Sequence, residues 1–381
     1  MSDEIRKLVG SALAEIIDSA KSGGPRVRVG LMAVGSEHGP EEIARGARLA
    51  AQSGGVSPVM IGPRLSGYDE LEWMECAEDD VPATLEAAVK AGKVEGAVAM
   101  HFPFPLGVTT IGRVVTPGRG KPMILASTTG TSSTVRGEAM LRNAVYGIAV
   151  AKALGIPSPT VGILNVDTAQ PVFRALSHMK EKGYPITFGE SVRADGGAVL
   201  RGNDILSGAV DVCVTDTLTG NVLIKMFSSF TTGGSFESLG WGYGPSCGEG
   251  WRNVVSIVSR ASGAPVIANA LTFTATVVAG GLPDLVASEL KAARKAGLDD
   301  EIVALTPKAA AAEEEVKAPP AEPTDDELHG IDVLEIDDAV RVLWKAGIYA
   351  ESAMGCTGPV IKMAERNIEK AKELLQQNGY L

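Results

Sequence analysis

Aromatic side chains and cysteines are both scarce in this 381-residue chain. Phe, Trp and Tyr together make up 5% of the sequence, and there are 4 cysteines. The cysteines are far apart and form no CxxC pair, so the sequence carries neither a thiolate metal motif nor a compact disulfide framework. We therefore expect a reduced, cytoplasmic protein without a bound metal.

Long apolar runs and basic clusters are missing as well. No apolar stretch reaches the roughly 18 to 20 residues that cross a bilayer, and the acidic start of the amphipathic segment 5–17 is unlike a signal peptide. The formal net charge is -11, which leaves no basic stripe to contact nucleic-acid phosphates. We expect neither a membrane nor a nucleic acid among the partners.

Strand-like and helical segments alternate along most of the chain. Short apolar runs lead through glycine-bearing turns into helical patterns, which predicts an α/β fold. The expected architecture is a largely parallel open sheet with helices on both faces, in two lobes. The expected strands are 26–34, 56–62, 94–101, 122–126, 160–166, 186–192 and 210–216. The expected helices are 5–17, 40–52, 81–91, 136–154, 168–182, 217–230 and 283–296, with a helix and then a strand within 251–273.

One acidic stretch interrupts this pattern. Residues 306–329 are rich in Ala, Glu and Pro and have almost no large apolar side chains. They cannot bury enough surface to offset their ordering entropy. We interpret them as a linker or mobile surface loop between an α/β body, 1–305, and a C-terminal segment, 330–381, that completes this body.

Cys356 is the leading candidate nucleophile. It lies in the glycine turn 355–358, after the strand-like run 348–354, and a helical pattern follows from Pro359. The dipole of a helix that begins there would stabilise the thiolate and lower the thiol pKa. The alternative is that Cys356 is a small buried apolar residue, as most cysteines are.

Two strand ends are candidates for phosphate binding. The polar segment 127–134 connects a predicted strand to a predicted helix, although it lacks the lysine of a P-loop. Its candidate ligands are Ser127, Thr128 and Thr129. Another predicted strand ends in Asp216, and Asn221 and Lys225 share one face of the helix that follows. The alternatives are an ordinary Ser/Thr loop, and an ordinary Asp N-cap beside a solvated lysine.

The segment 231–251 is unusual in composition. It contains seven glycines together with two tryptophans and a tyrosine, which suggests a functional loop or a contact surface. Cys247 lies within it, as a rival nucleophile or as a resolving thiol that pairs with another sulfur or selenium.

Three stretches together resemble the bacterial acyl-carrier-protein:phosphate acyltransferase family of phospholipid synthesis. Residues 27–47 contain Gly-Ser-Glu-His-Gly-Pro where that family has Gly-Gly-Asp-His-Ala-Pro. Residues 210–225 resemble its Asp-Gly-Phe-Thr-Gly-Asn-Val segment with a following lysine, and 355–361 fall at a similar glycine turn that lacks cysteine. The resemblance covers most of the chain outside 306–329, and it implies a fold related to isocitrate and isopropylmalate dehydrogenases. The implied active-site turn contains Asp216, Thr219, Gly220, Asn221 and Lys225.

At three places the chain departs from that family, and there it resembles the alpha (small) subunits of component C of glycine/sarcosine/betaine reductase complexes. These departures are Cys356, Glu37 before His38, and the segment 231–251. The resemblance implies that a carboxymethyl selenoether on a selenoprotein, component A, is converted to an acetyl thioester on Cys356. Phosphate then attacks the thioester and releases acetyl phosphate.

The candidate residues suit these steps chemically. Cys356 would be the nucleophile and acyl carrier, while Lys225 and Asn221 would bind phosphate. His38 would position phosphate or transfer a proton, and Asp216 would orient Lys225. The further phosphate ligands would be Ser127, Thr128, Thr129, Thr219 and Gly220. We expect no tightly bound cofactor, inorganic phosphate as a substrate, and component A, the component C beta subunit and a second copy of this chain as partners.

Two other functions are compatible with the same sequence. A free-standing acyltransferase that uses long-chain acyl carrier protein or acetyl-CoA predicts activity without partners and little effect of losing Cys356. A non-catalytic scaffold subunit predicts a buried, unreactive Cys356. A dehydrogenase fits poorly, because no GxGxxG turn with an acidic residue about 20 positions later is present.

Overall fold

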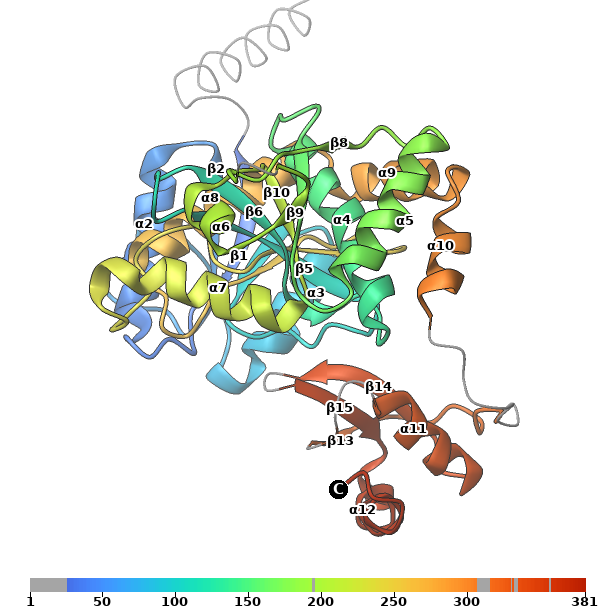
Figure 1. Ribbon diagram of the computed structural model, residues 1–381. Helices are drawn as coiled ribbons and strands as arrows, with labels where there is room; N and C mark the ends of the chain where they lie inside the picture. Colours follow the sequence, from blue (N-terminus) through green and yellow to red (C-terminus); the bar gives the residue numbers. More distant parts are fainter. Residues whose placement is uncertain (1–25, 194–195, 307–315, 330, 332–334, 356–357) are drawn as a thin grey trace, which may run out of the picture.

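The chain folds into a large α/β body and a small C-terminal module, which lies below the body in Figure 1. The computed structural model describes residues 26–193, 196–306, 316–329, 331, 335–355 and 358–381. The predicted helix 5–17 and Cys356 lie outside these residues.

The body is built on one mixed sheet. Its strands are β1 (Val27–Met32), β2 (Val56–Gly62), β3 (Glu72–Glu75), β4 (Gly96–Ala99), β5 (Val108–Val115), β6 (Pro122–Thr131), β7 (Thr160–Leu164), β8 (Thr187–Phe188), β9 (Val199–Leu200), β10 (Val212–Val214), β11 (Gly244–Gly248) and β12 (Val255–Ile257). The order is β3-β2-β1-β4-β12-β11-β5-β6-β10-β7-β8, with β9 on β7. β5 and β11 run antiparallel to their neighbours, and the other pairs are parallel. The predicted, largely parallel sheet is therefore confirmed, with two parallel halves joined by an antiparallel centre.

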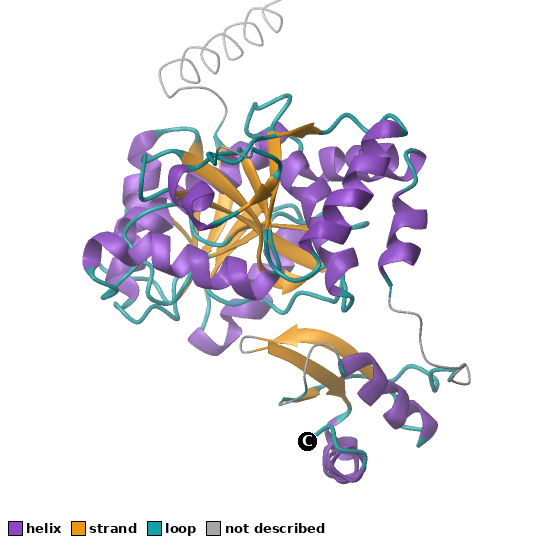
Figure 2. Cartoon of the chain, viewed as in Figure 1, coloured by secondary structure: helices purple, strands orange, loops and turns teal. Residues whose placement is uncertain are grey.

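Helices cover both faces of this sheet (Figure 2). They are α2 (Pro40–Ser53), α3 (Val81–Lys90), α4 (Arg136–Ala153), α5 (Ala169–Glu181), α6 (Gly202–Ser207), α7 (Thr217–Ser229), α8 (Ala264–Ala279), α9 (Leu282–Lys295) and α10 (Leu298–Leu305). Near β1, α2 and α8 pack on one face and α3 on the other. Near β10, Val212 and Val214 face α4, whereas Cys213 between them faces Ile224 of α7, as the alternation of a strand requires. Of the described helices, none alone is long and apolar enough to span a membrane.

Three predictions in the middle of the chain are wrong. The connection 101–122 contains β5, and the predicted polar loop 127–134 instead continues β6 as far as Thr131. The reason is tertiary pairing, since β5 and β6 pair along their whole length and threonine suits a strand. Within 251–273 the predicted order is reversed, because β12 comes first and α8 follows.

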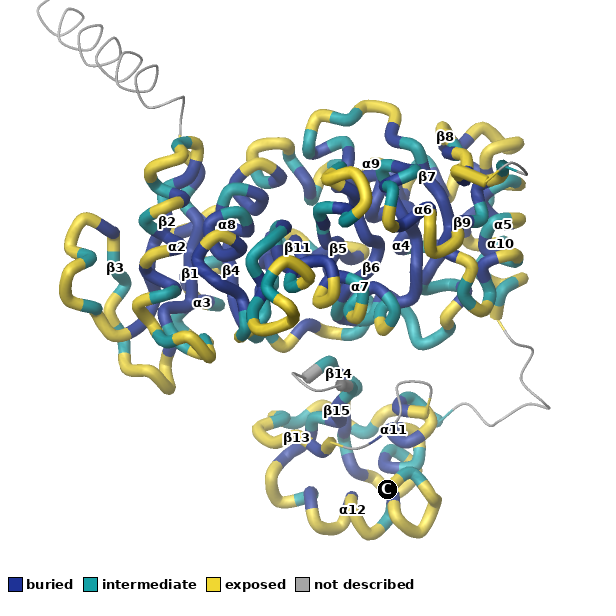
Figure 3. The backbone as a smooth tube through the Cα atoms, turned by 60° about the vertical axis from the view of Figure 1, so that its left-hand side comes forward, coloured by how far each residue is buried: buried dark blue, intermediate teal, exposed yellow. Residues whose placement is uncertain are grey.

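The C-terminal module has its own sheet and its own hydrophobic core. β14 (Ala350–Gly355) and β15 (Gly358–Met363) form an antiparallel hairpin, and β13 (Asp326–Leu328) pairs with the other edge of β15. Helices α11 (Ile336–Lys345) and α12 (Ile368–Gln377) pack on this sheet. Every described residue of the core lies between 328 and 375, and Figure 3 shows this buried interior apart from that of the body.

This module corrects the predicted domain organisation. Residues 330–381 do not complete the sheet of the body. The described part of 306–329 is also more than a linker, because β13 belongs to the module and Glu322 contacts Arg366 and Asn367 beside α12.

The helix that we predicted from Pro359 is also wrong, because Pro359 lies in β15. A proline is tolerated at this position although it has no backbone N–H to donate. The strand β13 pairs with Ile361 to Met363 and does not reach Pro359, so no hydrogen bond is needed from Pro359 on that side of β15. The helix whose dipole was predicted to stabilise a Cys356 thiolate is therefore absent from residues 358–363, and Cys356 itself lies outside the described residues.

Candidate active site

A cavity of about 390 Å³ opens where the body meets the C-terminal module. Its walls come from the chain just beyond β4 and β12, from β6 and α7, and from β14 of the module. The carboxyl ends of neighbouring parallel strands are the usual ligand sites of α/β sheets. The lining residues are Glu37, Met100, His101, Phe102, Phe104, Thr129, Gly130, Asn221, Lys225, Tyr243, Ile257, Val258, Ser259, Arg260 and Met354.

This cavity is basic, although the whole chain is acidic. Lys225 from α7 and Arg260 beyond β12 line it, together with the half-buried His101. Within the part of the chain that the structure describes, neither Lys225 nor Arg260 has a carboxylate partner, and the acidic lining residue is Glu37. Two cations that lack carboxylate partners favour an anionic ligand, and phosphate can accept several hydrogen bonds from them.

The glycine-rich segment supports Lys225. The Lys225 Nζ lies 5.3 Å from the ring centroid of Tyr243, whose hydroxyl donates a hydrogen bond to the Glu237 carboxylate at 3.3 Å. Ser262 donates to the same carboxylate at 2.9 Å, and Glu237 is buried. Burial and the nearby Glu237 raise the pKa of Tyr243, so its hydroxyl stays protonated as a donor. The segment 231–251 thus forms part of the cavity wall.

Asn221 and Thr129 are the other predicted phosphate ligands that line the cavity. The Asn221 amide donates to the carbonyl oxygen of Thr128 at 3.0 Å, which fixes α7 against β6. At this level the register between β5 and β6 shifts, between Thr110 and Ile111. Such an irregularity redirects side chains, and here it lies directly beside the cavity.

Ser127 and Thr128 do not face the cavity. Both side chains are fully buried. The Ser127 hydroxyl lies 2.7 Å from the hydroxyl of Thr217, and the Thr128 hydroxyl donates to the carbonyl oxygen of Tyr243 at 2.6 Å. Their polar groups hold α7 and the glycine-rich segment to β6, so they are not free to bind phosphate.

Asp216, Thr219 and Gly220 also have structural roles. Asp216 caps α7, accepting from the Thr219 N–H at 3.1 Å and from its hydroxyl at 2.6 Å. Asp216 faces Arg136, at 3.8 Å, rather than Lys225, so the predicted orientation of Lys225 by Asp216 is not observed. Gly220 packs against the backbone of β6.

The remaining candidates are not among the residues that line the cavity, or they lie outside the described residues. His38 is exposed, with Nε2 3.3 Å from the carbonyl oxygen of Ala261 and its ring edge-on to Phe236. Cys247, in β11, is 1% exposed, and burial raises its thiol pKa, which disfavours the rival-nucleophile reading. Cys356 lies outside the described residues.

Sequence reasoning missed His101, Ser259 and Arg260. Each follows the end of a parallel strand, β4 or β12, and these two strands are neighbours in the sheet. The position of His101 at the end of a predicted strand could have marked it as a candidate. The sequence does not show that β4 and β12 pair, however, so it could not place Ser259 and Arg260 beside His101.

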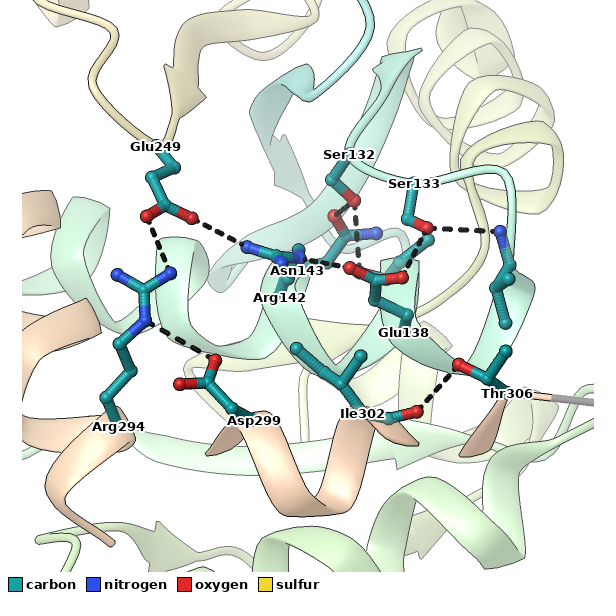
Figure 4. Close-up of polar contacts among 12 residues, drawn as sticks. Ser132, Ser133, Glu138, Arg142, Asn143, Glu249, Arg294, Asp299, Ile302 and Thr306 are labelled. Carbon is teal, nitrogen blue, oxygen red and sulfur yellow. Dashed lines mark hydrogen bonds and ion pairs between the residues drawn. The ribbon is translucent and has the colours of Figure 1, made fainter. Parts of the chain in front are cut away.

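A second cavity of about 460 Å³ lies at the start of α4. The positive charge of Arg142 in its lining is already neutralised by neighbouring carboxylates. Arg142 donates to Glu138 at 2.7 Å and to Glu249 at 3.1 Å, and Glu249 also pairs with Arg294 at 2.6 Å (Figure 4). The Ser133 hydroxyl donates to Glu138 and accepts a backbone N–H. An anion is therefore better accommodated in the first cavity.

Comparison with known proteins identifies the family. The model of a family described as fatty acid synthesis protein matches residues 27–362. The alpha subunit of component C of the glycine/sarcosine/betaine reductase complex from Peptoclostridium acidaminophilum is 50% identical over 385 residues, which cover 100% of this chain and 99% of that protein. The chain belongs to this component C alpha family. The resemblance drawn from the sequence is thereby confirmed.

The component C alpha family is also related to phosphate acyltransferases. A phosphate acyltransferase from Thermotoga neapolitana is 28% identical over 56% of this chain and 76% of its own length. Among solved structures, the EutD phosphotransacetylase from Staphylococcus aureus aligns with 66% of this chain and 94% of its own, at 13% identity and a TM-score of 0.43.

Proposed function

We propose that this chain forms acetyl phosphate from an acetyl thioester on Cys356. The acetyl group would come from a carboxymethylated selenoprotein component of a cytoplasmic reductase complex of the glycine/sarcosine/betaine type, in which this chain works beside a beta subunit. In that step the C–Se bond breaks, the selenium is oxidised to a selenosulfide with a thiol, the carbon gains the two electrons and becomes a methyl group, and one carboxylate oxygen leaves as hydroxide. The phosphate oxygen bonds to the carbonyl carbon, the C–S bond breaks, and the sulfur leaves as a thiolate. Inorganic phosphate is the substrate and no resident cofactor is required.

The pair of cations without a carboxylate partner among the described residues of the first cavity carries this proposal. Lys225 and Arg260 neutralise the charge of bound phosphate, and Asn221 and Ser259 add neutral donors. Met354 lies in the same cavity wall, and Cys356 follows it by two positions in the sequence. Two residues of chain span at most about 7 Å, so a thiol two positions beyond the wall is compatible with attack by phosphate held there.

Exchange of labelled phosphate into acetyl phosphate tests the cation pair. This exchange needs only the phosphate half-reaction and therefore only this subunit. Lys225→Gln and Arg260→Gln should each lower kcat/KM for phosphate roughly 10- to 100-fold, because each removes a charged hydrogen bond worth about 1.5–3 kcal/mol. Lys291→Gln is the matched control, since Lys291 is an exposed lysine on α9.

The loss of kcat/KM in the cavity variants is compared with the loss in the control. If Lys291→Gln lowers kcat/KM as much as Lys225→Gln does, the effect is a general electrostatic one and not that of a phosphate site. Unchanged exchange in both cavity variants would move phosphate binding elsewhere in the molecule.

We also propose that the chain forms a homodimer through α7. Four apolar side chains spaced four residues apart, each 47 to 72% exposed, follow one another along α7 and its C-cap: Leu218, Val222, Met226 and Phe230. Contiguous exposed apolar rows mark interaction surfaces.

Light scattering should therefore give about twice the 39.5 kDa chain mass for the wild type. A Leu218→Glu/Met226→Glu double variant should give the monomer mass, because two buried carboxylates oppose the contact. Val303→Glu, on the 75% exposed side chain of α10, should remain dimeric. A monomeric wild type would contradict the proposal.

A further inference from the structure

His101 occupies the seam between the body and the C-terminal module. It follows β4, lines the first cavity and is half-buried. None of the hydrogen bonds or ion pairs among the described residues uses its imidazole. Both ring nitrogens are therefore available to a molecule in the cavity.

Charges from both parts of the chain surround this imidazole. Glu327 of β13 and Lys362 of β15, which are opposite each other in the module, act on it, and so does Arg260 from the body. Lys225 and Glu37 line the same cavity. Partial burial lowers the pKa of His101 below its usual value; Glu327 opposes this shift, whereas Arg260 and Lys362 reinforce it. The imidazole is thus mainly neutral near pH 7 and able to accept a proton.

We infer that His101 is the proton-transfer residue of the phosphate step, an inference that rests on the proposed function. As an oxygen of HPO₄²⁻ bonds to the acetyl carbonyl carbon, the phosphate hydroxyl gives its proton to the neutral imidazole. The C–S bond breaks, the sulfur takes the electron pair, and the imidazolium returns the proton to the thiolate. The products are acetyl phosphate dianion and a free thiol, so proton and charge both balance. His101 takes the role that the sequence had assigned to His38, which lies outside the cavity.

The pH profile of phosphate exchange separates this role from a structural one. His101→Gln should lose roughly 100-fold in kcat and should keep only the part of the acid limb that phosphate protonation produces, since glutamine does not titrate. Glu327→Gln should keep the rate at alkaline pH and move the acid limb to lower pH, because the carboxylate that raises the pKa of His101 is gone. Lys362→Gln should move it to higher pH by the same argument. The ionisation of phosphate is common to all variants, so the differences report the imidazole.

His178→Gln is the matched control, because His178 is exposed on α5. The inference is overturned if His101→Gln exchanges phosphate at the wild-type rate, or if neither Glu327→Gln nor Lys362→Gln moves the acid limb. The latter two substitutions test it even if His101→Gln does not fold. Absence of exchange in the wild type would instead overturn the proposed function itself.

Discussion

Cys356→Ala is expected to abolish both acetyl loading and phosphate exchange. Wild-type protein incubated with acetyl phosphate should gain one acetyl group in intact-mass spectrometry, and the variant should gain none. We expect exchange to fall by about three orders of magnitude or more, because the covalent route is lost. The thiols of Cys213 and Cys247 cannot replace it, since burial raises the pKa of both.

Cys76→Ala is the matched control for this experiment. Cys76 is partly exposed, and its removal should leave the acetyl adduct unchanged. An adduct that survives in Cys356→Ala would place the nucleophile elsewhere. Exchange in the variant that appears only when coenzyme A or acyl carrier protein is added would favour direct transfer by a free-standing acyltransferase, because exchange without an acyl acceptor needs an acyl-enzyme. A wild type with neither signal would contradict the acetyl-enzyme and would favour the free-standing acyltransferase or the scaffold subunit.

Gly220→Ala is expected to destabilise the body strongly and to inactivate the site. A Cβ at this position would lie 1.8 Å from the carbonyl oxygen of Ser127, so α7 would have to move away from β6. Relieving such a backbone clash costs about 3 kcal/mol or more in the free energy of unfolding. The displacement would also carry Asn221 and Lys225 out of register with the cavity.

Urea unfolding measures this effect. Gly202→Ala is the control, because a Cβ at the start of α6 would meet no atom within 4 Å, and its unfolding free energy should change by less than about 0.5 kcal/mol. A Gly220→Ala variant as stable as wild type would show that α7 does not approach β6 this closely.

Hydrophobic periodicity was sufficient for several long elements of the two parallel halves of the body, although the short elements β3, β9, α6 and α10 were not predicted. The strand predicted at 56–62 is β2 with the same bounds, and the helix predicted at 136–154 is α4 with one residue fewer. Their apolar patterns are set locally by burial against the sheet. The antiparallel centre was missed because the Ser/Thr composition of β6 is typical of loops, and only pairing with β5 makes it a strand.

The candidate site was predictable only where one local motif contributes it. Asn221 and Lys225 lie four residues apart on one helix, so their shared face follows from helical geometry. Arg260 and His101 are far apart in sequence and meet because β4 and β12 are neighbours, which no local pattern specifies. Asp216 was misjudged because an N-cap and a catalytic carboxylate look the same in sequence.

The separate core of the C-terminal module has a consequence for local concentration. The module is joined covalently to the body, and it contacts it through backbone bonds such as that from the Met354 N–H to the carbonyl oxygen of Phe104, 3.1 Å. Tethering by a short connection gives two parts of one chain an effective concentration in the millimolar range. A docking contact with an intrinsic Kd of only about 1 mM is then half occupied at all protein dilutions. Under the proposed function, a contact of this strength would suffice to bring the module to the phosphate site and would also let the module meet the protein donor between turnovers.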